Sequence, residues 1–283
     1  MNMKKFSKYL ALLLALSMVF ALAACSGADE DADSSPTGGS VASDAVVVDK
    51  SDNIAEVTTV QAGKLHMSTN AAFPPYEMMN DAGDYIGIDV EVANAIAQKL
   101  GLELVVDDMD FDAALMAVQQ GQSDIAMAGI TVKPERAEVM DFSVTYAKGV
   151  QVVIVKEGSP IASVDDLADA DLIGTQRGTT GYSYCIDDYG DDHVTAYDNG
   201  ATAVQALLNN QVDAVVIDNE PAKAFVAANE GLTILDTAYA DEDYAIAVQK
   251  GNTQLLDAVN QAIAELQADG TFQAIVDKYI KAE

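Results

Sequence analysis

Tryptophan is absent from this 283-residue sequence, and histidine and cysteine occur only twice each. His66 and His193 lie in no Ser-His-Asp arrangement and in no metal-ligand spacing. The sequence therefore predicts no catalytic residue, no metal site and no cofactor. No histidine lies near Cys185 in the sequence, so we interpret this cysteine as a small, partly buried thiol rather than a reactive one.

Basic residues are also scarce, with 15 Lys and Arg against 45 Asp and Glu and a net charge of −30. A field of this sign repels nucleic acid and anionic lipid surfaces, so we expect neither as a partner. The charge favours solubility, but it does not identify a ligand, because local groups decide what a site binds.

Long apolar runs are missing as well. The run at residues 10–24, interrupted only by Ser17, is too short for a membrane-spanning helix, which needs ~20 residues. It follows three lysines within the first eight residues, so we predict a secretory signal peptide over residues 1–24. Residues 22–25 read Leu-Ala-Ala-Cys and resemble the bacterial lipobox, which implies a lipid-modified Cys25 at the new N-terminus. An ordinary cleavage site before a cysteine is the alternative. Lipidation of Cys25 leaves Cys185 alone and excludes an internal disulfide.

Residues 25–59 contain no aromatic side chain and are rich in small and acidic residues. Such a segment buries too little apolar surface to offset the entropy of ordering it. We therefore predict a flexible acidic tether over residues 25–59.

Predicted strands and helices alternate from about residue 64 onward, which is typical of α/β domains with mostly parallel strands. We expect Asp89, Ser163 and Asn199 to cap helices. The expected strands are 64–69, 102–106, 125–128, 150–155, 172–176, 212–217 and 244–248. Apolar residues at helical spacing predict two terminal helices after residue 250.

An internal similarity relates residues 115–127 to residues 204–216. Both units read as a helix, a tight turn, Gln-x-Asp and a buried strand. The offset of 89 residues is a domain spacing, so two similar lobes are predicted. Parallel sheets place ligands at the loops that follow such strands, and here those loops begin near Gly129 and Asp218.

Two oppositely charged residues lie at these loops. Thr131 precedes a helix that begins at Pro134, and Arg136 lies in its first turns, where helix N–H groups and a guanidinium suit a carboxylate. Asp218 follows a buried strand and could hold an ammonium group. A surface ion pair for Arg136 and a helix cap for Asp218 are the alternatives. If the two loops face each other, the pair forms a receptor for a zwitterion.

Phe73 lies in a loop stiffened by Pro74 and Pro75, and Phe111 directly precedes a helix predicted to begin at Asp112. The two aromatic side chains could form apolar walls for a ligand side chain, or they could belong to the core. The residues leave both interpretations open.

The chain resembles the bacterial extracellular solute-binding proteins of family 3, the polar amino acid receptors of ABC importers, over about residues 62–281. The matching segments are 70–77, Gly-Ile-Asp-Val at 87–90, Met-Ala-Gly-Ile-Thr-x-x-Pro-Glu-Arg at 127–136, Asp-Phe-Ser at 141–143, Gly-Thr-Thr-Gly at 178–181 and 213–218. The resemblance implies a periplasmic-binding-protein-like α/β fold, the Venus-flytrap arrangement of two α/β lobes joined by two crossover strands. Lobe 1 would span residues 60–148 plus 243–283, and lobe 2 residues 149–242.

The same resemblance implies the roles of the site residues. Arg136, the Thr131 region, Thr179 and Thr180 would bind an α-carboxylate. Asp218, the Gly129 carbonyl and Thr131 would bind an α-ammonium group. Phe73 and Phe111 would sandwich the ligand side chain, and Asn70 and Gln176 would meet its far end. Many family members have Asp where this chain has Asn70, so a neutral amino acid is expected, although Glu77 or Asp110 could substitute for that acid.

The function implied is capture of a free L-amino acid between the lobes and its delivery to the permease of an ABC importer. The protein would be a monomeric, lipid-anchored lipoprotein on the extracytoplasmic face of the membrane, extracellular or periplasmic. Two alternatives are a dehydratase-type enzyme on the same fold and an amino acid sensor module. The scarcity of histidine argues against the enzyme, and a sensor would need a separate membrane partner.

Overall fold

The computed structural model describes residues 39–281, which belong to one compact unit of residues 37–283. The predicted signal peptide, the lipid site at Cys25 and the first part of the predicted tether lie outside the described residues. Among the residues that are described, no helix combines the length and apolar character that crossing a membrane requires.

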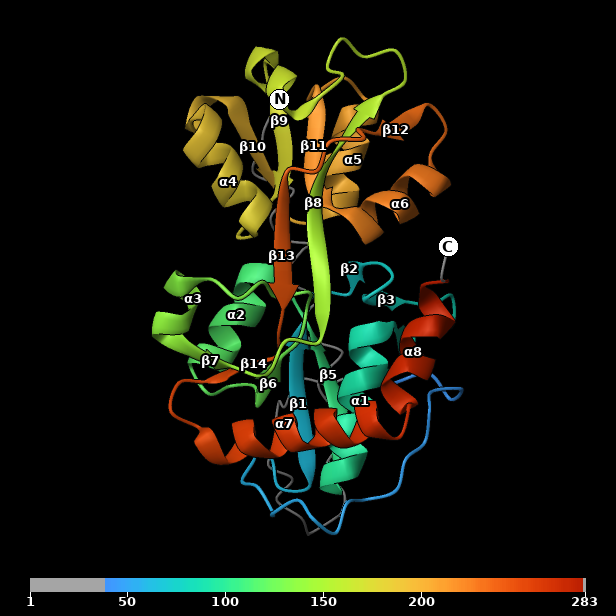
Figure 1. Ribbon diagram of the computed structural model, residues 1–283, viewed down its shortest axis with the longest axis vertical. Helices are drawn as coiled ribbons and strands as arrows, with labels where there is room; N and C mark the ends of the chain where they lie inside the picture. The colour runs from blue at the N-terminus through green and yellow to red at the C-terminus, as the bar shows by residue number, and fades with distance from the viewer. Residues whose placement is uncertain (1–38, 282–283) are drawn as a thin grey trace, which may run out of the picture. The chain divides into compact units, whose positions relative to one another are not determined.

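Lobe 1 is built on a five-stranded sheet in the order β5-β1-β6-β14-β7. Its strands are β1 (Lys64–Thr69), β5 (Glu103–Asp108), β6 (Ile125–Ala126), β7 (Met140–Phe142) and β14 (Ala247–Gln249). Its helices are α1 (Ile88–Leu100), α2 (Phe111–Gln119), α3 (Pro134–Val139), α7 (Thr253–Ala268) and α8 (Thr271–Tyr279), and a small sheet joins β2 (Ala72–Phe73), β3 (Glu77–Met79) and β4 (Tyr85–Ile86). Figure 1 shows this lobe in the lower half of the view.

Lobe 2 repeats the scheme with a sheet in the order β10-β9-β11-β8-β12. Its strands are β8 (Ala147–Lys156), β9 (Ile173–Gln176), β10 (Val194–Tyr197), β11 (Ala214–Asp218), β12 (Leu232–Ile234) and β13 (Ala240–Tyr244). Its helices are α4 (Thr180–Tyr189), α5 (Gly200–Leu208) and α6 (Asn219–Ala228), with 3-10 turns at Val164–Asp169 and Asp191–His193.

The internal similarity seen in the sequence has a structural counterpart. In lobe 1, α2 leads into β6, which lies beside β1; in lobe 2, α5 leads into β11, which lies beside β9. Both strands are parallel to that neighbour, so their carboxyl ends lie at equivalent edges of the two sheets. This edge is where parallel sheets place ligands.

Two long strands, β8 and β13, run between the lobes as an antiparallel pair (Figure 1). The expected fold of two α/β lobes joined by two crossover strands is therefore confirmed. The predicted lobe boundaries at 148/149 and 242/243 fall within these two strands.

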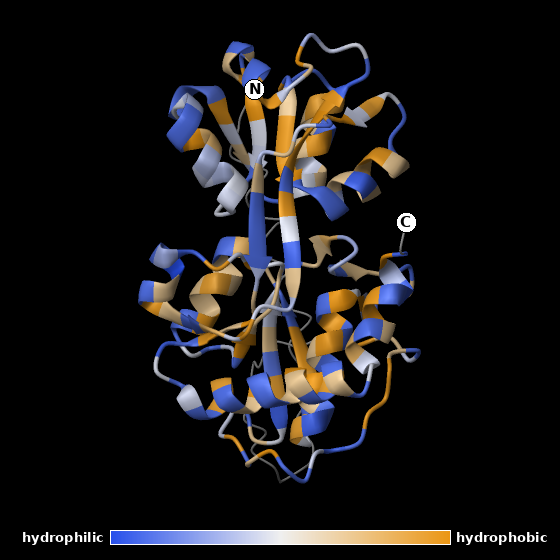
Figure 2. Cartoon of the chain, in the orientation of Figure 1, coloured by the Kyte–Doolittle hydropathy of each residue, from blue (hydrophilic) through white to orange (hydrophobic). Residues whose placement is uncertain are grey.

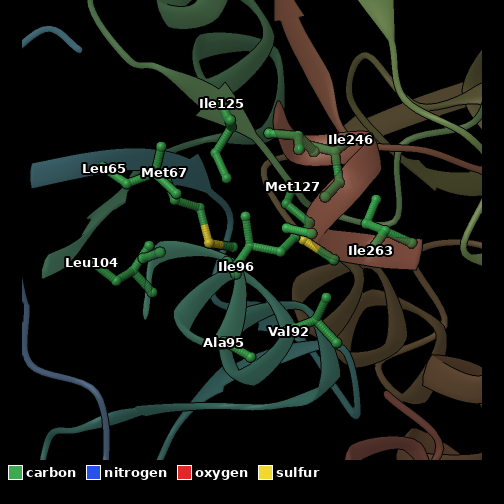
Figure 3. Packing of buried hydrophobic residues seen from close by; sticks show 14 of the residues in the cluster. Leu65, Met67, Val92, Ala95, Ile96, Leu104, Ile125, Met127, Ile246 and Ile263 are labelled. Carbon is green, nitrogen blue, oxygen red and sulfur yellow. The ribbon is translucent and has the colours of Figure 1, made fainter. Parts of the chain in front are cut away.

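The core of lobe 1 follows from apolar residues on β1, β6 and the helices that cover them. Leu65, Met67, Ile125, Ile96 and Ile263 are fully buried in one cluster (Figure 3). In α7 the buried residues recur at helical spacing, and Figure 2 shows the blue faces of this helix alternating with orange ones. In lobe 2, apolar residues pack on both faces of the sheet, so its central strands β9 and β11 are buried throughout.

Helix capping was predicted correctly at two of three positions. The Asn199 side chain accepts from the backbone N–H of Thr202 at 2.9 Å, and Ser163 forms a capping box with Asp166. The prediction was wrong for Asp89, because Gly87 occupies the cap of α1 and Asp89 is buried within its first turn. The buried Asp89 carboxylate therefore points toward the interior of the protein rather than toward the end of α1.

The segment 39–60 lies along lobe 1, and we call it the strap. The backbone N–H of Val48 donates to Gln98 in α1 at 2.7 Å, and the Ser51 hydroxyl donates to Glu265 in α7 at 2.9 Å. The backbone N–H of Val60 donates to Asp124 at 2.7 Å. This part of the predicted tether therefore contacts the fold at several separate points.

Candidate functional site

A pocket lies between the two lobes, beside the crossover strands, with an empty volume of about 460 Å³ that includes its opening to solvent. The ten residues predicted to contact a ligand all line it. They are Asn70, Phe73, Phe111, Gly129, Thr131, Arg136, Gln176, Thr179, Thr180 and Asp218. Glu77, Ala128, Gln151, Val216, Ile217, Glu242 and Tyr244 complete the lining. The pocket is thus lined mainly by polar groups from both lobes, more than is usual for small-molecule sites, which suits a polar ligand.

Arg136 enters the pocket from α3, which begins at Pro134. Its Nη1 donates to the Thr131 carbonyl at 3.0 Å, and its Nη2 donates to the Gly178 carbonyl of lobe 2 at 3.1 Å. The guanidinium lies 5.4 Å from the centre of the Phe111 ring. Burial lowers the pKa of Arg136, while the negative Glu242 opposes this change. An arginine remains protonated in such surroundings, so lobe 1 presents a fixed cation.

Asp218 lies at the end of β11 and faces the same pocket from lobe 2. It occupies the cap position of α6, but its side chain makes no capping hydrogen bond. The Tyr244 hydroxyl donates to its Oδ2, and its Oδ1 is buried without a hydrogen-bond partner among the described residues. Burial raises the pKa of Asp218 to about 7. A buried carboxylate with a free oxygen suits a cationic ligand group.

The loop after β6 is shaped by Gly129 and Thr131. Gly129 has φ = 54°, and a Cβ there would also meet the Phe73 ring, so this turn requires glycine. Its N–H donates to the buried Asp89 at 2.9 Å. The Thr131 hydroxyl donates to Glu242 on β13 at 2.9 Å. Both polar groups are therefore held in position by buried acids.

Asn70 and Gln176 meet directly across the lobes. The Gln176 Nε2 donates to the Asn70 Oδ1 at 3.0 Å, and the Asn70 Nδ2 donates to the Met109 carbonyl at 2.9 Å. The amide groups thus form one end of the pocket.

The two aromatic side chains have the dual character that the sequence left open. Phe111 is buried in an apolar cluster of lobe 1 and also lines the pocket. Phe73 is half-buried, stacks on Tyr76 with ring centres 5.9 Å apart and reaches the clusters of both lobes.

Thr179 and Thr180 lie at the start of α4. Thr179 caps this helix by accepting from the Tyr182 N–H at 3.3 Å, and it donates its hydroxyl to the Gln176 carbonyl at 2.8 Å. The first N–H groups of a helix have no internal partner, so this end of the pocket favours an anion.

Some pocket residues were missed by sequence reasoning. Gln151, Glu242 and Tyr244 lie on the crossover strands, far in sequence from the other site residues. The alternation Asp-Glu-Asp-Tyr at 241–244 was a signal, because Glu242 and Tyr244 are buried while the two aspartates are exposed.

Glu77 of lobe 1 also lines the pocket, and it lies beside the buried Asp89. It is 1% exposed, and burial together with the neighbouring Asp89 carboxyl raises its pKa well above the usual value. Burial raises the pKa of Asp89 to about 6. Two adjacent buried carboxyls share protons, so this pair carries less than its full charge at neutral pH.

The fold and the pocket define a two-lobed solute-binding protein whose site is completed by both lobes. The sequence model of the bacterial extracellular solute-binding proteins, family 3, matches residues 65–282, and the chain belongs to this family.

Relatives within the family support this assignment. The chain is 31% identical over 227 residues to the L-cystine-binding protein TcyJ of Escherichia coli K12, covering 79% of this chain and 85% of the relative. It is 27% identical to the arginine-binding extracellular protein ArtP of Bacillus subtilis, covering 98% and 99% of the two chains. A solved structure of an ancestral arginine-binding protein bound to glutamine has a TM-score of 0.75 and 37% identity, covering 78% of this chain and all of that one.

Proposed function

We propose that this protein captures a free L-amino acid as a zwitterion, with Arg136 binding its α-carboxylate and Asp218 binding its α-ammonium group. Its family and relatives make it the substrate-binding component of an amino acid ABC importer. The observation that supports the binding mode is that a half-buried guanidinium from lobe 1 and a buried carboxylate from lobe 2 line the same pocket.

The proposed order of events follows from the position of these groups. The ligand first contacts lobe 1 through Arg136 and the Phe73 and Phe111 walls. Lobe 2 then adds Asp218 and the N–H groups at Thr179 and Thr180 by a hinge motion at the crossover strands. Exclusion of water strengthens both charge pairs, because the effective dielectric constant falls. Delivery to the permease would follow when the lobes separate.

The side chain of the proposed ligand carries hydrogen-bond donors. Glu77 adds a carboxyl to that of Asp218, against the single cation Arg136 in the pocket lining. This excess of acid favours an arginine-type ligand and, next, an amide such as glutamine over an apolar amino acid. Relatives named for arginine, histidine and glutamine are consistent with this class.

A thermal-shift screen of the purified protein against the twenty L-amino acids tests the proposal. A ligand that binds only the folded state raises the melting temperature by mass action. We expect the largest shift with L-arginine, a smaller one with L-glutamine and none with D-arginine. Absence of a shift with all twenty would refute the proposed function.

We further propose that the protein is a monomer anchored through lipid on Cys25, and that it performs no catalysis. Asp218, with its pKa raised to about 7 by burial, and Glu77, with its pKa also raised by burial, are the lining carboxyls that favour a dehydratase-type alternative. Incubation with arogenate or prephenate and product detection separates the two functions. Turnover would refute the binding-only proposal.

A further inference from the structure

Glu242 is a buried acid that has so far been described only as the hydrogen-bond partner of Thr131. It lies on the crossover strand β13, is 6% exposed and lines the pocket. Ionised side chains are costly to bury unless several partners compensate them. The surroundings of its two carboxylate oxygens therefore indicate what the residue does.

One oxygen is fully engaged. Oε2 accepts from the Thr131 hydroxyl of lobe 1 at 2.9 Å and from the Gln151 Nε2 of the other crossover strand at 3.0 Å. The second oxygen, Oε1, is buried and makes no hydrogen bond of normal geometry among the described residues, although the Tyr184 hydroxyl is a further neighbour of this carboxylate. Glu242 thus holds a ligand-contacting threonine to the hinge and keeps one acceptor free.

The backbone places this acceptor on the same side as Asp218. Glu242 pairs with Gly149 across the β13–β8 ladder, and directly opposite residues project side chains to the same face. A Cβ on Gly149 would collide with the Asp218 carboxylate and the Tyr244 hydroxyl, so these groups occupy that face. Glu242 and Asp218 therefore flank one glycine from neighbouring strands.

Electrostatics link Glu242 to both ends of the proposed ligand. After burial, Glu242 is the largest influence on the pKa of Arg136, and it helps burial to raise the pKa of Asp218. An ammonium group has three N–H donors and needs three acceptors when buried. Asp218 Oδ1, Glu242 Oε1 and the Gly129 carbonyl together supply this number.

We propose, building on the proposed function, that Glu242 is a further ligand-binding residue whose Oε1 accepts a hydrogen bond from the α-ammonium group. Its Oε2 holds Thr131 against Gln151, so the residue links ligand recognition to both crossover strands. Glu242 distinguishes amino acids from the corresponding acids that lack the α-amino group.

Calorimetry on the full mature protein tests this role with matched ligands and matched variants. The ligands are L-arginine and δ-guanidinovalerate, which lacks only the α-amino group, together with the pair L-glutamine and glutaramate. The variant E242Q is compared with D241N, which makes the same charge change at an exposed position of the same strand. Circular dichroism and the melting temperature check folding of both variants.

We expect E242Q to weaken L-arginine binding by about tenfold to a hundredfold and to change δ-guanidinovalerate binding by less than about threefold. D241N should bind both ligands as the wild type does. An equal loss for both ligands, or no loss for L-arginine, would overturn the role of Glu242. The wild type is measured first. If it binds no amino acid, both the proposed function and the role of Glu242 are overturned; if it binds, the variants test the role of Glu242 alone.

Should E242Q fail to fold, a crystal structure of the wild-type protein with L-arginine decides the question. Glu242 Oε1 within about 3.2 Å of the α-nitrogen would support the proposal. A separation beyond about 4 Å, or contact with the guanidinium instead, would overturn it.

Discussion

The two lobes share a topology but contribute different chemistry to the pocket. Lobe 1 supplies the guanidinium of Arg136, the aromatic walls and Glu77, and it is further covered by the strap and the two terminal helices. Lobe 2 supplies Asp218, Gln176 and a helix start, with apolar residues on both faces of its sheet. Equivalent edges of the two sheets therefore present a cation in lobe 1 and an anion in lobe 2.

The sharpest way to break this comparison is to remove the cation of lobe 1. Arg136→Ala leaves the ligand carboxylate and nearby acids without a buried partner, which costs ~3–5 kcal/mol. We expect affinity for the preferred amino acid to fall by roughly two to four decades in calorimetry. Arg177→Ala is the control, because the Arg177 side chain is 53% exposed and pairs with Asp198 at 3.8 Å. Near-wild-type affinity in the Arg136 variant would contradict the proposed site.

A second test sharpens the role of lobe 1 in selecting the ligand side chain. Glu77→Gln replaces the buried carboxyl by an amide of similar size, so a cationic ligand loses an acceptor that can ionise beside it. We expect L-arginine affinity to fall by about tenfold and L-glutamine affinity to change by less than about threefold. Glu103→Gln, at an exposed position on β5, should leave both unchanged. Parallel losses for the two ligands would instead indicate that Glu77 only supports the fold.

Asp218 offers a test of lobe 2 through pH. Burial raises its pKa to about 7, well above the usual value of an aspartate, so between that usual value and pH 7 the folded chain holds a proton that the unfolded chain has lost. The group therefore adds stability at low pH, and this contribution is lost as the pH rises through 7. We expect the melting temperature of the ligand-free wild type to fall by a few degrees more than that of Asp218→Asn between pH 5 and pH 8.

The buried pair Glu77 and Asp89 also has raised pKa values. The pair is present in both the wild type and Asp218→Asn, so its contribution to the pH dependence cancels when the two are compared. Asp241→Asn, at an exposed site, should follow the wild type. Identical pH profiles for the wild type and Asp218→Asn would show that Asp218 is already ionised throughout this range.

The smallest expected effect on binding concerns the strap, which covers lobe 1 alone. A chain beginning at residue 61 loses the hydrogen bonds of Val48, Ser51 and Val60, whereas a chain beginning at residue 39 keeps them. We expect the shorter chain to melt about 5 °C lower, with an unchanged dissociation constant for the amino acid. A large change in affinity would mean that the strap influences the pocket.

Much of the fold was predictable because the lobes obey local rules. Buried strands, helix spacing and the repeated helix–turn–strand unit gave the two-lobed arrangement, and the ends of β6 and β11 indicated where the pocket lies. The alternation at 241–244 could have indicated that Glu242 is buried, but its role stayed hidden because its contact with Thr131 joins residues 111 positions apart. The strap escaped notice for a similar reason: most of its valines and Ile54 pack on lobe 1, and its backbone N–H groups bond to side chains of lobe 1 that are distant in the sequence.

Gly149 has a consequence for how this protein can vary. Its φ is not in the left-handed region, so the position needs glycine for space alone. A one-base change in a glycine codon gives either a stop signal or a residue with a Cβ, or leaves glycine in place. Each of the new residues would push against the Asp218 carboxylate and the Tyr244 hydroxyl. In a library of random variants, position 149 should therefore be among the least tolerant sites outside the core, with losses in uptake preceding losses in expression.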